Sequence, residues 1–306
     1  MRLRTDVFLA CLTVGACRPR EVTDLPICLA EVAMDQASEA SAQAAPFDVW
    51  LSILIPGFDR STLRVPDAPH TCGRQPLEVR WPEGQRTPAI LPPRPLTAAD
   101  VTFGEGPAGQ VLIWVRIATY DNGEAMGPVA LARWIDKGIE VRGIGTLVAP
   151  ARRATLRLET VGKGERVLVV EGAVCPDLAN HSCTHEAQIL SLENQRFVNV
   201  GLAEGAAPKA RARIRLDDHY ETTQAGGVVR RYRLARRLSF GEPGVQVSDD
   251  IRIENCDAPG EAQRCEEYRS IQDKRILVRK QGTFVTTISA WDRLMSEVDN
   301  PPTGRP

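Results

Sequence analysis

The chain has 306 residues and carries 38 lysines and arginines against 39 aspartates and glutamates, giving a formal net charge of −1. This balance excludes the classes of protein that hold nucleic acid or an anionic membrane surface by charge alone. The length suffices for one large β domain or for two domains of ordinary size.

The first seventeen residues have the pattern of an export signal. Arg2 and Arg4 precede an apolar stretch at 7–14, a length typical of the apolar region of a signal peptide. The stretch is too short to cross a bilayer, which takes about 20 apolar residues. We therefore predict a cleaved signal peptide over residues 1–16.

The end of this segment, Val14-Gly15-Ala16-Cys17, has an aliphatic residue, two small residues and a cysteine. It resembles the lipobox of bacterial lipoproteins. The resemblance implies that the Cys17 sulfur is acylated and that Cys17 becomes the N-terminus, anchored in a membrane of the bacterial cell envelope. Arg18, instead of the Asp that retains some lipoproteins in the inner membrane, implies the outer membrane. The resemblance covers only this segment, and the mature domain resembles no family that we recognise. Ordinary secretion with an unmodified Cys17 is the alternative.

The number of cysteines bears on whether Cys17 is acylated. Of eight cysteines, Cys11 leaves with the signal peptide, and a lipid on Cys17 leaves six, an even number in an oxidising compartment. Short loops rich in turn residues favour two local pairs, and the third pair follows by elimination. Sequence alone leaves other connectivities open. The predicted disulfides are Cys175–Cys183, Cys256–Cys265 and Cys28–Cys72.

Residues 17–46 are polar and rich in Ala and Ser, which predicts a tether after the lipidated cysteine; a short helix is the alternative. We expect partial order near Cys28, whose disulfide would hold it to the domain. Residues 47–55 alternate apolar and polar side chains, which predicts a strand. Nine prolines between 56 and 100 predict loops and short edge strands there.

From residue 111 onward, apolar segments recur at hairpin spacing with turn residues between them. They predict an all-β fold, an antiparallel meander of about a dozen strands arranged as two packed sheets or an open barrel. A short propeller is less favoured because the internal echoes have unequal spacing. We expect one β domain over 47–295 and a disordered tail over 296–306. The predicted strands are 111–115, 129–135, 139–148, 154–161, 166–170, 187–192, 197–200, 210–216, 228–234, 245–254, 268–279 and 283–290.

Three patterns could carry chemistry. Cys175, His181, Cys183 and His185 could converge on zinc, although a disulfide-closed loop with two solvated histidines is the favoured interpretation. The run 217–221, Asp-Asp-His-Tyr-Glu, could supply acid–base groups, but its place at a strand end is more typical of a polar turn. The glycines at 104, 106 and 109 match G-x-G-x-x-G, yet they lead into a strand, so we expect a loop. The sequence thus predicts no catalytic residue, metal or cofactor.

Arginines alternate with apolar residues in two segments. Arg211 and Arg213 lie on one face of the first segment, and Arg231 and Arg233 repeat the pattern in the second. If the two strands were neighbours in a hairpin, these guanidinium groups would form a surface for envelope polyanions. The alternative is a solvated sheet face balanced by carboxylates.

These expectations favour a lipid-anchored bacterial envelope protein that acts as a binding or assembly module, with an envelope protein or a polyanion as its partner and no nucleic acid. The alternative is an envelope hydrolase whose site is assembled from residues far apart in the sequence. No local motif decides whether the chain is an enzyme.

Overall fold

A computed structural model describes residues 25–31, 46–77, 88–90, 94–107, 109–135, 138–177, 182–204, 207–224, 226–257 and 264–299. The predicted signal peptide, Cys17, most of the tether and residues 300–306 lie outside these ranges. Within them the chain forms nineteen strands and two α-helices, which confirms the all-β class.

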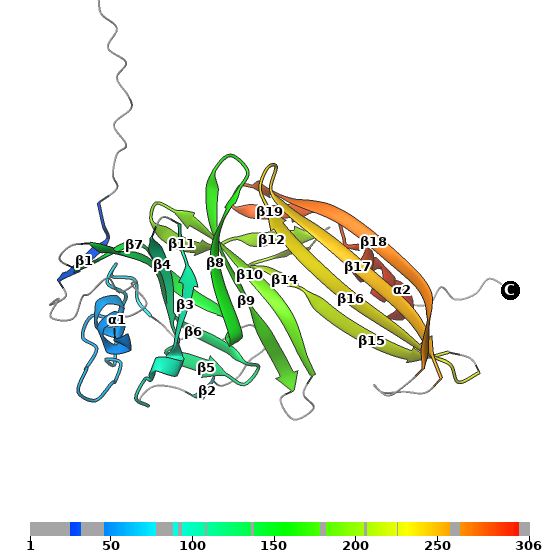
Figure 1. Cartoon of the computed structure of the whole chain (residues 1–306), viewed down its shortest axis with the longest axis horizontal. Helices are drawn as coiled ribbons and strands as arrows, with labels where there is room; N and C mark the ends of the chain where they lie inside the picture. Colours follow the sequence, from blue (N-terminus) through cyan, green and yellow to red (C-terminus); the bar gives the residue numbers. More distant parts are fainter. Residues whose placement is uncertain are drawn as a thin grey trace, which may run out of the picture.

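Eight strands close into a barrel in the order β6-β7-β11-β10-β9-β8-β3-β4, with β4 pairing back to β6 (Figure 1). Most neighbours are antiparallel, but β11 joins β7 and β3 joins β8 in parallel, so the chain is more than a simple meander. The barrel strands are β3 (Val101–Glu105), β4 (Gln110–Val115), β6 (Glu124–Ile135), β7 (Gly138–Pro150), β8 (Arg152–Val161), β9 (Glu165–Asp177), β10 (Ser182–Glu193) and β11 (Arg196–Asn199).

Four further strands extend the barrel sheet. The strand β1 (Cys28–Glu31) pairs with β7, and β14 (Ala212–Arg215) pairs with β10. On the other side of β6, β5 (Ala118–Tyr120) pairs with β6 and β2 (Pro88–Ile90) pairs with β5. The order predicted near Cys28 is therefore present, as β1.

The strand β4 shows why the barrel forms. Leu112 and Trp114 point into the barrel and pack with side chains from β6, β8, β9, β10 and β11. Ile113 and Val115 point outward and are also fully buried, against the segment that follows the tether. A strand that is apolar on both faces needs cover on both.

That outer cover is a helix, α1 (Phe47–Leu54), so the strand predicted over 47–55 is wrong. Trp50, Leu51 and Leu54 share one face of the helix and are fully buried. The Trp50 ring meets Phe103 and Trp134 edge-on, with ring centroids 6.4 and 6.5 Å away. Eight residues satisfied the period of a strand and that of a helix alike, and packing against the barrel selected the helix.

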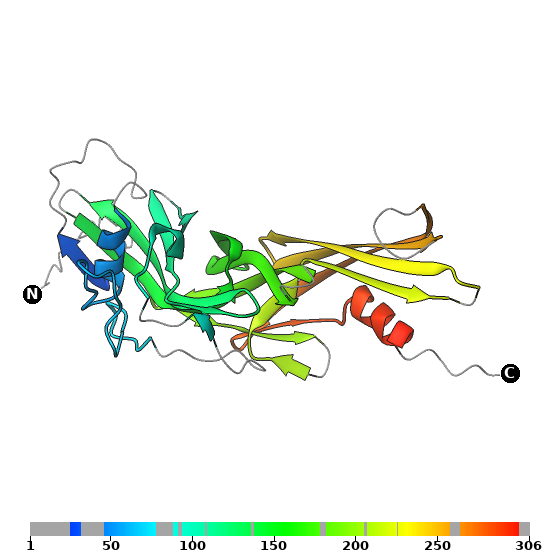
Figure 2. The same ribbon diagram turned by 90° about the horizontal axis from the view of Figure 1, so that it is seen from below.

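A second sheet of seven strands runs away from the barrel, with the order β13-β12-β19-β18-β17-β16-β15 (Figure 2). Its pairings are antiparallel except for β12 with β19. The α-helix α2 (Ala290–Asp299) packs on one face of its far part. The strands are β12 (Gly201–Glu204), β13 (Ala207–Lys209), β15 (Asp217–Thr223), β16 (Val229–Phe240), β17 (Val245–Cys256), β18 (Cys265–Lys280) and β19 (Thr283–Thr286).

One face of β17, in the middle of this sheet, is buried along its length. On β17, Val245 and Val247 pack against the outside of β9 and β10, and Ile251 and Ile253 pack against α2. Asp249 lies between these two apolar regions, and its side chain is fully buried. Because side chains alternate along a strand, all five residues point to this same face.

The Asp249 carboxylate is held by two buried arginines. It accepts hydrogen bonds from Arg236 Nε at 2.6 Å and Nη2 at 2.8 Å, and from Arg275 Nη1 at 2.7 Å. Burial alone would raise the pKa of Asp249, but the two guanidinium groups outweigh it and hold the pKa below its ordinary value. The Asp249 carboxylate is therefore ionised at neutral pH.

All three predicted disulfides are present: Cys28–Cys72, Cys175–Cys183 and Cys256–Cys265. The first ties β1 to the loop after α1. The other two join neighbouring strands, β9 with β10 and β17 with β18.

The second α-helix extends into the segment predicted to be disordered. Residues 296–299 were predicted as part of a disordered tail, but they form the last turn of α2, whose Trp291, Leu294 and Met295 pack on the second sheet. Among the described residues, neither α-helix is long and apolar enough to cross a bilayer.

We expect Asp249→Asn to lower the free energy of unfolding at neutral pH by about 3–5 kcal/mol, because the buried Arg236 loses its carboxylate partner and Arg275 loses one of its partners. Asp249 has a folded pKa below the unfolded value of about 4, so its ionisation stabilises the protein above that pH. This stabilisation is lost as the pH falls through the folded pKa. Urea unfolding between neutral and acid pH should therefore show a smaller acid loss in the variant than in the wild type.

Asp250→Asn is the matched control. This neighbour lies on the opposite face, its side chain is 45% exposed, and its oxygen lies 3.8 Å from Arg252 Nη2. Its cost should stay within about 1 kcal/mol. Equal losses in both variants would contradict the role assigned to Asp249.

Candidate functional site

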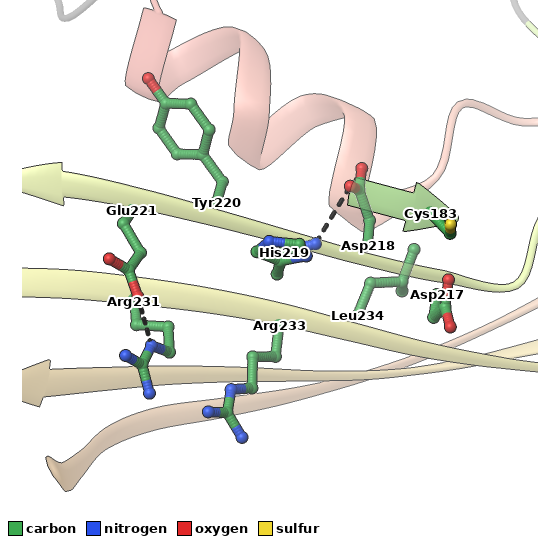
Figure 3. Close-up of a pocket in the computed structure, with 9 residues that line it drawn as sticks. All are labelled: Cys183, Asp217, Asp218, His219, Tyr220, Glu221, Arg231, Arg233 and Leu234. Carbon is green, nitrogen blue, oxygen red and sulfur yellow. Dashed lines mark hydrogen bonds and ion pairs between the residues drawn. The ribbon is translucent and has the colours of Figure 1, made fainter. Parts of the chain in front are cut away.

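A groove of about 760 Å³ follows β15 where this strand leaves the barrel, and it contains the densest run of titratable residues in the sequence (Figure 3). It begins at Cys183, next to the disulfide of β9 and β10. It continues along β15 and the neighbouring part of β16. The lining residues are Cys183, Asp217, Asp218, His219, Tyr220, Glu221, Arg231, Arg233 and Leu234.

The run 217–221 is part of a strand, so the polar turn expected there is wrong. It forms β15 because it pairs with β16 residue by residue, from Asp217 opposite Ala235 to Thr223 opposite Val229. As the last strand of the sheet, β15 needs no apolar face of its own, which explains why its sequence carried no strand pattern.

Alternation along β15 separates the acidic groups. Asp217, His219 and Glu221 point to one face, and Asp218 and Tyr220 point to the face that α2 covers. Because they lie on opposite faces, Asp217 and Asp218 cannot act as a pair on one substrate atom.

Each carboxylate of the run accepts a hydrogen bond from the protein itself. Asp217 Oδ1 accepts from the His185 N–H at 2.6 Å, and Glu221 Oε1 from Arg231 Nε at 2.6 Å. Asp218 Oδ2 accepts from Arg215 Nη1 at 2.5 Å and from Trp291 Nε1 at 3.1 Å. These contacts give the carboxylates a structural role: they fix the start of β15, its outer face and the docking of α2.

The predicted arginine hairpin does not form. Ala212–Arg215 joins the barrel sheet as β14, because Ala212 and Ile214 are buried between the barrel and the second sheet. The chain then passes Leu216 and enters β15, which becomes the neighbour of β16 instead. Arg211 and Arg213 are thus separated from Arg231 and Arg233.

Three of the four arginines are paired with carboxylates. The buried Arg231 pairs with Glu221. Arg233, with half of its side chain exposed, has its Nε 3.6 Å from Glu254 Oε2. Arg213 forms an ion pair with the fully buried Glu124. Arg211 lies just before β14 and is half-buried.

Around Arg213 lies a buried polar cluster that the sequence did not indicate. Glu186 Oε2 lies 3.4 Å from Arg213 Nε, and Gln188 donates to Asn199 Oδ1 at 3.2 Å. Burial raises the pKa of Glu186 and lowers the pKa of Arg213. The alternation of Glu186 and Gln188 in β10 could have indicated a polar cluster on one face of that strand. Nothing in the sequence indicates that Glu124 lies at the same place.

Two of the four residues considered as zinc ligands, Cys175 and Cys183, form a disulfide with each other and so offer no thiolate to a metal. His181 lies outside the described residues. Among the residues that are described, one group of ligand types comes together, Glu254 with Cys256 and Cys265, and its two cysteines also form a disulfide.

The glycine pattern at 104–109 has a packing explanation. Gly104 lies inside β3 rather than in a loop, and a Cβ atom there would fall 2.2 Å from the Leu156 carbonyl oxygen. The glycine therefore permits the close approach of β3 to β8 in the barrel.

No family model, no curated protein and no solved structure matches this chain.

Two arginines of the groove should respond differently to removal. Arg231→Ala should lower the free energy of unfolding by about 2 kcal/mol, because a buried side chain and the ion pair with Glu221 are lost together. Arg233→Ala should cost less than about 1 kcal/mol, since its side chain is 52% exposed. Chemical denaturation of both variants tests this, and equal costs would show that the structural assignment of Arg231 is wrong.

Proposed function

We propose that this chain is a lipid-anchored protein of the bacterial cell envelope, in the outer membrane, and that its β structure serves as a binding or assembly module. The observation that carries the anchor is the cysteine pairing. Three disulfides use all six cysteines after Cys17, so Cys17 is left over in the exported chain. A diacylglycerol thioether accounts for that sulfur, and disulfides belong to an oxidising compartment.

The first described strand agrees with a tether. β1 begins at Cys28, and its pairing with β7 and its disulfide to Cys72 attach the chain to the barrel there. The segment from Cys17 to Cys28 would therefore connect the lipid to a firmly held point of the domain. About eleven residues can span at most about 40 Å, which keeps the domain close to the membrane.

Recognition rather than catalysis is favoured by the groove along β15. Its carboxylates already accept hydrogen bonds that hold β15, α2 and Arg231 in place. Its arginines are paired, so a protein segment fits the groove better than a polyanion that would need several free guanidinium groups. An envelope protein is thus the partner class that we propose.

The anchor is tested by expressing the full chain with Cys17→Ser in a bacterial host that processes lipoproteins. The wild type should take up radiolabelled palmitate and sediment with membranes, and the variant should lose both properties, because the acceptor sulfur is gone. Cys11→Ser is the matched control and should keep both, since Cys11 lies in the predicted signal peptide. A Cys17→Ser protein that still carries the label would refute the proposed anchor.

A further inference from the structure

We propose that β15 pairs with β15 of a second copy of this chain, antiparallel and about a two-fold axis at Tyr220, so that the two seven-stranded sheets become one. This inference rests on the assembly role proposed above and names its partner. Four features of β15 point to it: backbone groups that face no described strand, an open approach, a long edge without proline or lysine, and a self-complementary sequence.

The hydrogen-bond register shows which backbone groups of β15 face away from β16 and from every other strand that the structure describes. Arg236 N–H donates to the Leu216 oxygen, and Gln224 N–H donates to the Val228 oxygen, so the even-numbered residues turn their backbone groups toward β16. Alternation then turns the groups of His219, Glu221 and Thr223 toward the open edge. The His219 N–H reaches only the neighbouring Asp218 carboxylate, at 3.0 Å. A partner strand would find hydrogen-bonding groups at every second residue.

The edge is accessible beyond Asp217. The strand β10 contacts only the start of β15, where the His185 N–H meets Asp217. The hairpin of β9 and β10 then diverges from β15 in both views (Figures 1 and 2). His219, Tyr220, Glu221 and Thr223 are exposed.

The two ends of this sheet are built differently. The edge strand β13 has three residues, and two of them are Pro208 and Lys209, the residue types that proteins use to block pairing at a sheet edge. The edge strand β15 has seven residues and contains neither type. The charged side chains of β15 are carboxylates, and each already accepts a hydrogen bond within the chain. The β15 edge is therefore longer and less protected than the β13 edge, which favours pairing with a further strand.

The sequence of β15 complements itself in one register. With the axis at Tyr220, His219 lies opposite Glu221 of the second copy, and Glu221 lies opposite its His219. With the axis at Glu221, two carboxylates would face each other, and with the axis at His219, Asp217 would face Glu221. Among these three registers, the Tyr220 register alone places an imidazole, a possible hydrogen-bond donor, opposite a carboxylate on both sides of the axis.

Tyr220 itself fits the central position. It is 38% exposed, and its ring packs beside Tyr232 with centroids 6.2 Å apart. Its backbone groups point to β16, so two copies of Tyr220 would form a non-hydrogen-bonded pair with Cα atoms about 4.5 Å apart. Such pairs bring aromatic side chains into contact and would bury two surfaces that water now reaches.

Cysteine substitution tests this register. The full chain is expressed with Tyr220→Cys, and the total protein of the cells, membranes and soluble fraction together, is analysed without reducing agent. Because the two positions would lie at disulfide distance, a covalent dimer is expected. Thr222→Cys is the matched control on the same face of the same strand: its copies would be separated by about 13 Å, four residues along the strand, and should stay monomeric.

A monomeric Tyr220→Cys protein, or equal crosslinking of both variants, would overturn the proposed pairing. Denaturation midpoints close to that of the wild type ensure that each variant is folded. The palmitate label is read in the same samples. A labelled monomer contradicts the dimer alone, and an unlabelled dimer contradicts the anchor alone.

Discussion

The buried contact of Asp249 with Arg236 and Arg275 connects the two halves of this molecule. It lies where the buried face of β17 passes from the barrel to α2. Arg236 also donates from Nη1 to the Arg215 carbonyl oxygen at 3.1 Å, which fixes the end of β14 to the second sheet. Arg275 reaches Glu204 of β12 at 3.3 Å. A charge buried at this depth is tolerated only when its partners are held in place, so the cluster favours one orientation of the sheet on the barrel.

Much of the fold follows from local sequence. The barrel strands alternate or are apolar throughout, and the turn residues between them set hairpin spacing, so residues such as Leu112 and Val169 indicated a strand without tertiary information. The disulfides followed from loop closure, because short loops bring their own ends together. The helix α1 was missed because eight residues fit two periods, and only the barrel surface under Trp50 decides between them.

The candidate site needed information that the sequence does not contain. Arg213 and Arg231 have the same alternating surroundings, yet one enters the barrel sheet and the other the second sheet. The difference arises at Leu216, whose N–H donates to the His185 oxygen of β10 and whose carbonyl accepts from Arg236 of β16. One residue thus ends the barrel sheet and begins the other. Pattern analysis identifies strands but not their neighbours, so it could not place the acidic run beside Arg231 and Arg233.

The same transition explains why the edge of β15 is open. On one edge of β10, β11 pairs with residues 190–193 and β14 with residues 186–189, and the chain leaves β10 after Arg215. The chain must then continue on the second sheet, where β15 is the last strand and is supported by β16 and by the contact of Asp218 with Trp291. Lengthening that sheet buries more apolar surface under α2, and each added residue of β15 also adds unpaired backbone. The free-energy cost of this unpaired backbone is offset where a second strand pairs with the edge. A longer outer sheet therefore goes together with an edge strand whose sequence complements itself.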